Sequence, residues 1–384
     1  MPVPPARGTA CARTRRWHEC LPPTNALAGA TPEAPVHAAM TLVPAVEPRV
    51  RPRPAGDRIA YVHDFRGLAV LFIVTTHTLS LFDWSANPEL ARVLKYLVAN
   101  GTTFFLFISG FLFEYLKGRY EVLDYWDKKL RFVVLPYLIV SAPALVAFVF
   151  LAARQGMPAG FEGLSDWQQM GYFLITGKHL APFWFIPTIV SFYLVSPLIL
   201  HATRDDRAFW ALPLLFVLPA FVGRSDNPLL NVVHFLPVWA LGMLMCRFRQ
   251  TAEPLLKRHL WQLLALSVAL GIAELAFTRG THTYLDYLQK TVLILFLVAA
   301  LLRLGSRATP WLGWAGTLSF GIFFVHSYVI TAFKFAFEYG FGQLPGGGVP
   351  QLLLAAAAAA LASALLVKAV IRLLGRRSRY VIGV

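Results

Sequence analysis

Two histidines lie within strongly apolar stretches of this sequence, where an ionisable side chain is costly. His77 occurs in RGLAVLFIVTTHTLS (residues 66–80), and His326 occurs in LSFGIFFVHSYVI (residues 318–330). A neutral imidazole, whose ordinary pKa is about 6.5, is well suited to take the proton of a hydroxyl group. We therefore predict that His77 is a general base and that His326 orients a substrate or stabilises developing charge. The alternative for His77 is a hydrogen bond between helices.

Arg66 is the third ionisable residue of these stretches. It precedes His77 by eleven residues, close to three turns of a helix and about 16 Å along its axis. The two side chains therefore fall on nearly one helix face. A helix that starts at the cytoplasmic side would hold Arg66 near the inner interface and His77 close to the bilayer midplane. Arg66 alone could also be an interfacial anchor.

The composition indicates a membrane protein. Of the 384 residues, 57% are hydrophobic and only 14% are charged, against roughly a quarter in a soluble domain. The net charge of +15 could favour nucleic-acid binding, but the basic residues lie between apolar runs, where orientation signals belong. We therefore exclude nucleic acid as a partner. The cysteines show neither a disulfide framework nor metal-ligand spacing, so no metal site is predicted; they are Cys11, Cys20 and Cys246.

The apolar runs predict an all-α fold with about ten transmembrane helices, because a chain that crosses hydrocarbon must satisfy its own backbone hydrogen bonds. The predicted spans are 60–82, 97–116, 132–153, 183–201, 208–223, 229–246, 260–278, 284–302, 313–337 and 351–371. The lysine and arginine residues are concentrated on every second connection between these spans. The connections of one side carry 25 of them, and those of the other side carry six. The bias predicts that both termini are cytoplasmic. We expect a multi-pass protein of the inner (plasma) membrane.

The first 56 residues differ in kind from the rest. They are rich in proline, arginine and alanine, contain no apolar run, and are interpreted as a disordered cytoplasmic tail. A signal peptide would need an apolar core of about 7–15 residues, which is absent. Translation from Met40 would shorten the tail. Residues 57–375 are predicted to form the transmembrane domain, and 376–384 a short basic cytoplasmic tail.

Five segments, in order along residues 60–375, resemble the acyltransferase-3 family of integral membrane O-acyltransferases. DFRGLAVLFIVTTH (64–77) is similar to that family's first helix, in which an arginine, ten further residues and a histidine follow one another; Arg66 and His77 match them. Many members have an acidic residue three positions before the arginine, where this sequence has His63, with Asp64 one position later. The other segments are FFLFISGFLFEYL (104–116), YWDKKLRFVVLPYLI (125–139), FWFIPTIVSFYLVSPLIL (183–200) and SFGIFFVHSYVI (319–330).

The resemblance implies transfer of an acyl group, usually acetyl, from acetyl-CoA or another acyl-CoA to a hydroxyl. The acceptor would be a cell-surface glycan or glycoconjugate, and no cofactor would be bound permanently. His77 and His326 would be catalytic; an acyl-histidine intermediate is the alternative. The polyanionic donor would meet the basic residues expected at the cytoplasmic mouth of the site. These are Arg66, Lys128, Lys129 and Arg131, although the last three also fit an ordinary positive-inside loop.

Two other functional classes fit parts of the pattern. A transporter or flippase of a glycan or lipid-linked precursor would also use a polar site near the midplane. However, the two histidine-bearing segments share no spacing pattern that would indicate an inverted repeat. A catalytically silent scaffold or sensor would leave the paired histidines unexplained. The acceptor, the acyl group and the oligomeric state are open from the sequence.

Overall fold

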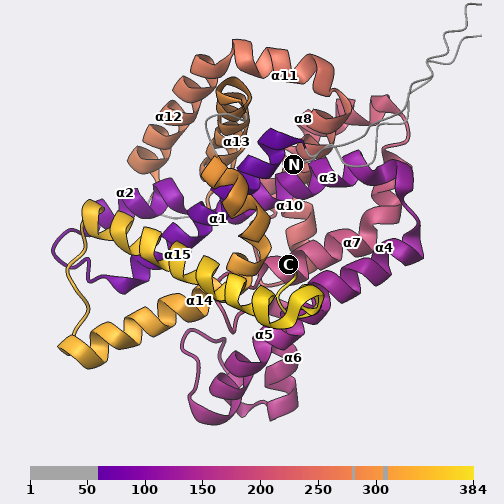
Figure 1. Cartoon of the computed structure of the whole chain (residues 1–384). Helices are drawn as coiled ribbons and strands as arrows, with labels where there is room; N and C mark the ends of the chain where they lie inside the picture. The colour runs from indigo at the N-terminus through magenta and orange to yellow at the C-terminus, as the bar shows by residue number, and fades with distance from the viewer. Residues whose placement is uncertain (1–58, 279–281, 306–309) are drawn as a thin grey trace, which may run out of the picture. The chain divides into compact units, whose positions relative to one another are not determined.

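A computed structural model describes residues 59–278, 282–305 and 310–384; the tail predicted over residues 1–56 lies outside these ranges. The described chain is built from α-helices, joined by turns, loops and short 3₁₀- or π-helical segments (Figure 1). In chain order the α-helices are α1 (Ala60–Thr78), α2 (Pro88–Val98), α3 (Gly101–Leu116), α4 (Val122–Lys129), α5 (Leu135–Val146), α6 (Asp166–Thr176), α7 (Phe185–Ala202), α8 (Leu212–Leu215), α9 (Leu218–Phe221), α10 (Pro228–Arg247), α11 (Arg249–Arg258), α12 (Leu260–Phe277), α13 (Tyr284–Leu304), α14 (Pro310–Phe341), α15 (Val349–Leu374) and α16 (Ser378–Val381).

Eight helical stretches of the described residues are long and apolar enough to cross a membrane. They are Pro88–Arg119, Val122–Leu151, Phe185–Ala202, Pro228–Arg247, Leu260–Phe277, Tyr284–Leu304, Pro310–Phe341 and Val349–Val381. Each contains or largely overlaps one of the ten predicted spans. A ninth predicted span, 60–82, corresponds to α1, a continuous helix of 19 residues that is not among these eight stretches. The chain is therefore an all-α, polytopic membrane protein, as predicted.

The prediction of a continuous helix over residues 208–223 is wrong. The chain there forms the 3₁₀-helix η6 (Asp206–Ala211) and the four-residue helices α8 and α9, each of which has a proline in its first turn. Proline lacks an N–H and collides with the preceding turn, so it ends a helix rather than extending it. The segment still runs along α10, because Arg247 Nη1 donates to Asp206 at one end and the Ser225 N–H donates to Asn231 at the other. It therefore connects the two ends of α10 by short helical turns and not by one continuous helix.

Helices α1 and α14 pack in parallel with their backbones in contact. A Cβ atom on Gly67 would collide with the carbonyl of Leu312, and one on Gly316 would collide with the carbonyl of His63. The His63 ring also lies against Thr317, with 3.2 Å between Nε2 and Oγ1. Small residues allow such close approach between membrane helices. These contacts join the start of α1 to the start of α14 and fix the two helices in register.

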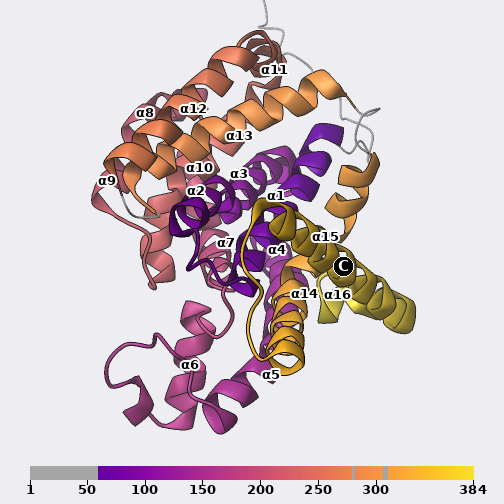
Figure 2. The ribbon, with the colours of Figure 1, turned by 90° about the vertical axis from the view of Figure 1, so that its left-hand side faces the viewer.

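Helices α3 and α10 form a second pair with touching backbones (Figure 2). A Cβ atom on Gly110 would collide with the carbonyl of Trp239, and one on Gly242 would collide with the carbonyl of Phe107. Trp239 is almost fully buried there and stacks on Phe192 of α7, with 5.3 Å between ring centroids. This tightly packed pair carries a polar cluster at each of its two ends.

The last helices cover the α1–α14 pair. Helix α15 runs antiparallel to α14, because Lys368, near the end of α15, lies over the ring of Trp314 near the start of α14 at 5.0 Å. The residues predicted as a short C-terminal tail include α16, which packs on α5. Arg379 there lies over the ring of Phe132 at 4.5 Å. The basic C-terminal residues are thus folded against the helices.

Candidate active site

The two intramembrane histidines meet at the contact between α1 and α14. Their ring centroids lie 5.4 Å apart, and the ring planes are inclined by 36°. His77 follows Gly67 by ten residues, and His326 follows Gly316 by the same number, which is about 15 Å along a helix. Equal spacing along parallel helices brings both histidines to one level. The glycine contact therefore sets the position of the histidine pair.

His326 is fully buried, and one hydrogen bond fixes its tautomer. Its Nδ1 lies 3.0 Å from the carbonyl oxygen of Ile322, which can only accept, so Nδ1 carries the proton. Nε2 then carries a lone pair, and within the described residues it has no hydrogen-bond partner. A buried acceptor without a partner is costly. Such an atom is suited to accept a hydrogen bond from a group that enters the site.

His77 is the more accessible member of the pair. It stands in the last turn of α1, and its side chain is partly exposed. Its carbonyl oxygen accepts a hydrogen bond from Ser80 Oγ at 2.7 Å, where the chain leaves the helix. His77 interacts electrostatically with His326 and also with Arg224. An accessible imidazole next to a buried one can take up and release a proton without losing its position.

Arg66 lies on the same helix as His77 but near its beginning. The eleven-residue spacing corresponds to about 16 Å along α1. The Arg66 side chain is partly exposed. The arginine is therefore near the beginning of α1, whereas His77 is in its last turn.

The three basic residues predicted at the mouth of the site have different surroundings. Lys128 Nζ lies 2.6 Å from Asp124, and Arg131 Nε lies 2.8 Å from Asp127, each pair spaced by four residues and exposed. Lys129 instead lies over the rings of Tyr125 and Tyr193, at 5.0 and 4.4 Å from their centroids. Among the three, Lys129 is the one whose charge faces aromatic rings rather than a neighbouring carboxylate.

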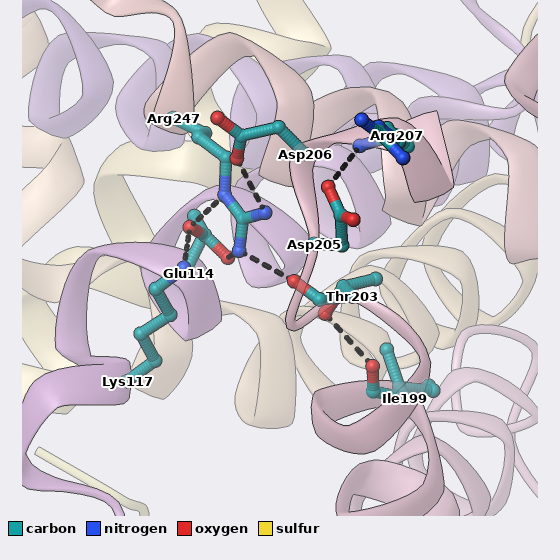
Figure 3. A network of polar contacts seen from close by, with 8 residues as sticks. All are labelled: Glu114, Lys117, Ile199, Thr203, Asp205, Asp206, Arg207 and Arg247. Atoms are coloured by element: carbon teal, nitrogen blue, oxygen red, sulfur yellow. Dashed lines mark hydrogen bonds and ion pairs between the residues drawn. The ribbon is translucent and has the colours of Figure 1, made fainter. Parts of the chain in front are cut away.

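A buried ion network lies at the end of the α3–α10 pair that was predicted to be cytoplasmic (Figure 3). The carboxylate of Glu114 binds Arg247 Nε at 2.8 Å and also pairs with Lys117. Arg247 Nη1 lies 3.0 Å from Asp206, and Nη2 donates to the carbonyl of Thr203 at 2.7 Å. The Glu114 side chain is only 3% exposed, so its charge is balanced inside the protein by these basic side chains. The network ties the ends of α3, α7 and α10 together.

A pocket lies at the opposite end of the α3–α10 pair. It has about 270 Å³ of empty space, part of it open to solvent. We call it the Arg224 pocket, and its lining residues are Asn100, Thr103, Arg224, His234, Phe235, His282, Thr283, Asp286, Tyr287 and Lys290. In the described part of the chain, the histidines here and in the pair above do not form a group of three or more metal-ligating side chains.

Arg224 places a positive charge in this pocket. Its guanidinium stacks on the ring of Trp184 at 3.8 Å, and its Nη1 donates to His282 Nε2 at 3.3 Å. Burial lowers the pKa of Arg224 to about 10, so the group is still charged at neutral pH. Burial, together with the charge of Arg224, lowers the pKa of His282 to about 4, so its ring is neutral. The pocket thus presents a fixed cation held by a ring and a neutral imidazole.

Sequence reasoning missed Arg224 and His282 as site residues. Arg224 was counted only as one of six basic residues on the sparsely charged side. That scarcity is itself a signal, because an arginine there is not explained by the orientation rule. Lys290 was not singled out as a site residue either; its Nζ lies 3.8 Å from Asp286, while Glu274 accepts a hydrogen bond from Thr283 at 2.7 Å.

Comparison with protein families gives one match across most of the chain. The acyltransferase-3 model, described as an acyltransferase domain, matches residues 59–372. Comparison with curated proteins and with solved structures gives no match. The matched range covers α1 to α15 and contains both histidines. The chain therefore belongs to the acyltransferase-3 family, and it is a multi-pass membrane acyltransferase.

Proposed function

We propose that this acyltransferase moves an acyl group, most simply acetyl, from acyl-CoA to a hydroxyl of a cell-surface glycan or glycoconjugate. It would do so in the inner (plasma) membrane, with His77 as the general base. The observation that carries the proposal is the contact between His77 and the buried His326, within a chain of acyltransferase family. A sugar hydroxyl is a weak nucleophile until a base takes its proton, and a neutral imidazole is suited to that step.

The reaction can be written as one balanced transfer. The acceptor oxygen attacks the carbonyl carbon of the thioester while its proton passes to the His77 imidazole. The bond between carbon and sulfur then breaks, and the imidazolium returns the proton to the departing thiolate. The products are an ester and the free thiol of coenzyme A. The unpartnered Nε2 of His326 would stabilise the positive charge that develops on His77.

The donor would approach from the end where α1 and α14 begin. Arg66 lies on α1 towards that end, and guanidinium groups bind phosphate well. Of the three basic residues around α4, Lys129 is the best supported, because Lys128 and Arg131 already pair with carboxylates. These residues support a polyanionic donor that enters from the cytoplasm, with the acceptor on the other side.

The test compares the surface glycans of cells that carry the wild-type gene with those of cells in which it is deleted. Mass analysis of the isolated glycans should find an acyl ester only when the protein is present. Purified protein with radiolabelled acetyl-CoA and these deacylated glycans should transfer the label. Equal acyl content in both strains, or movement of unmodified glycan across vesicles without label transfer, would overturn the proposal.

A further inference from the structure

We propose that the Arg224 pocket binds the acceptor, and that this acceptor is a hydroxylated anion such as an acidic sugar residue of a glycan. The identity of the ligand as acceptor rests on the proposed function above. The selectivity of the pocket for an anion stands on its own geometry.

The Arg224 guanidinium is the group of this pocket that an anionic ligand would bind. Its guanidinium is held by the ring of Trp184 and by the neutral His282, neither of which balances its charge. The carboxylate nearest in sequence, Asp226, instead binds Lys178 Nζ at 2.5 Å. Within the described residues, Arg224 has no ion pair with a carboxylate. A guanidinium fixed on a ring with donors to spare is a typical site for a carboxylate or phosphate.

The Asp286 carboxylate is the group of this pocket that a hydrogen-bond donor of the ligand would bind. Its residue is 2% exposed, and its Oδ1 has no hydrogen-bond partner in the part of the chain that is described. Lys290 Nζ is 3.8 Å from this oxygen, too far for a hydrogen bond, and donates instead to the carbonyl of Tyr96 at 2.6 Å. The other oxygen, Oδ2, already accepts from Asn100 Nδ2. A ligand hydroxyl is the group that would satisfy Oδ1.

His234 offers a second acceptor on the pocket wall. Its Nδ1 donates to the carbonyl of Val222 at 2.7 Å, so its Nε2 carries a lone pair. The Arg224 guanidinium therefore lines the pocket together with two hydrogen-bond acceptors, Asp286 and His234. A small molecule with one anionic group and several hydroxyls fits this set. A neutral sugar would leave Arg224 unmatched, and a simple anion would leave Asp286 and His234 unmatched.

The pocket is also electrostatically coupled to the predicted base. Arg224 interacts with His77, which contacts His326. The charge of a ligand bound to Arg224 would therefore also act on His77, which favours the acceptor as the occupant of the pocket.

The test measures binding of small probes to the full-length purified protein in detergent, without acyl-CoA. The probes are methyl glucuronide, which carries a carboxylate, neutral methyl glucoside of the same ring, and glucose 1-phosphate. We expect an anionic probe to bind at least about tenfold more tightly than the glucoside. The source of the anion follows from which probe binds: a carboxylate sugar if the glucuronide is preferred, a sugar phosphate if the glucose 1-phosphate is preferred.

Variants assign the preference to Arg224. Arg224→Gln should abolish it, and Arg224→Lys, which retains the charge but loses the planar fork, should keep part of it. The matched control is Arg154→Gln, since Arg154 also lies over a ring, that of Phe148 at 4.8 Å, but does not line the pocket. Unfolding temperatures of all variants show whether each is folded.

Three results would overturn the inference: no measurable binding of either anionic probe, equal binding of the neutral and anionic probes, or a preference that survives Arg224→Gln. The outcome is separate from the proposed function. If labelled acetyl-CoA gives no transfer but the anion preference is present and depends on Arg224, the acyl-transfer proposal fails and the anion site stands. If transfer occurs without any anion preference, the proposed function stands and this inference fails.

Discussion

Gly67 and Gly316 occupy equivalent places on α1 and α14, each ten residues before the histidine of its helix. A side chain at either position would collide with the backbone of the other helix. The distance between His77 and His326 is therefore set by a main-chain contact about 15 Å away along both helices. The histidine pair depends on two residues that have no chemistry of their own.

This relationship predicts the effect of a single methyl group. Gly67→Ala should force α1 away from α14, lower the free energy of unfolding by about 1–3 kcal/mol and reduce acyl transfer. Gly118→Ala is the matched control, because a Cβ atom there would meet nothing within 4 Å. Thermal unfolding and transfer rates of the two variants check the prediction. Equal behaviour of both variants would show that the glycine contact does not position the pair.

The network around Glu114 should contribute to stability rather than to catalysis. Glu114→Ala leaves Arg247, whose side chain is 10% exposed, without its closest carboxylate, so we expect a loss of about 3 kcal/mol. Glu89→Ala removes an exposed pair with Arg92 and should change stability by less than about 1 kcal/mol. Denaturant or thermal unfolding of the purified variants measures both. A similar loss of stability in Glu114→Ala and Glu89→Ala would contradict the expectation that the buried network contributes more than the exposed pair.

The surroundings of the α4 basic residues predict unequal roles in donor binding. Lys129→Gln should raise the KM for acetyl-CoA about tenfold, because its charge is not already matched by a neighbouring carboxylate. Lys128→Gln should change KM by less than about twofold, because Lys128 pairs with Asp124 in water. Steady-state kinetics with varied acetyl-CoA distinguishes the two. A larger effect for Lys128 would refute this assignment.

His179, between α6 and α7, should make stability depend on pH. It is fully buried, its Nδ1 donates to the carbonyl of Phe173 at 3.1 Å, and its Nε2 accepts from Ser141 Oγ at 2.7 Å. Burial lowers the pKa of His179 from 6.5 to about 4, although the bond to Phe173 opposes this shift. Between these values the unfolded chain binds more protons than the folded one, so stability falls as the pH falls through this window.

The corresponding measurement is thermal unfolding between pH 4 and pH 8 for wild type and His179→Gln. The stability lost between about pH 6.5 and pH 4 should be smaller in the variant, because its side chain does not titrate. The exposed His201 gives the control, and His201→Gln should retain the wild-type dependence. Parallel curves for wild type and His179→Gln would contradict the prediction.

Much of the fold could be predicted because every chain segment that crosses hydrocarbon must satisfy its own backbone hydrogen bonds, which favours a helix. Apolar runs such as 229–246 and 284–302 appear as α10 and α13 with nearly the predicted bounds. The run 208–223 looked the same by hydropathy, but Pro213 and Pro219 divide it into short helical turns. The amphipathic helix α2 (Pro88–Val98) was not predicted, because most of it precedes the apolar run 97–116.

The site could be predicted only in part, for a different reason. His77 and His326 stand out because charged or titratable groups in apolar helices are rare. That they touch depends on the glycine contact, which joins residues far apart in sequence. The Arg224 pocket draws residues from α3, α10, α13 and three connections, so no local sequence pattern indicates it. The pairing of Lys128 and Arg131 with aspartates four residues away was, by contrast, readable from the spacing.

The central claim is that the His77 imidazole takes the proton of the acceptor hydroxyl. The most direct measurement is transfer of label from radiolabelled acetyl-CoA to deacylated surface glycan by purified wild type and His77→Ala. We expect the variant to accumulate in the membrane with a normal unfolding temperature but to transfer label about 10²–10⁴ times more slowly. Transfer by a folded His77→Ala variant at the wild-type rate would contradict it.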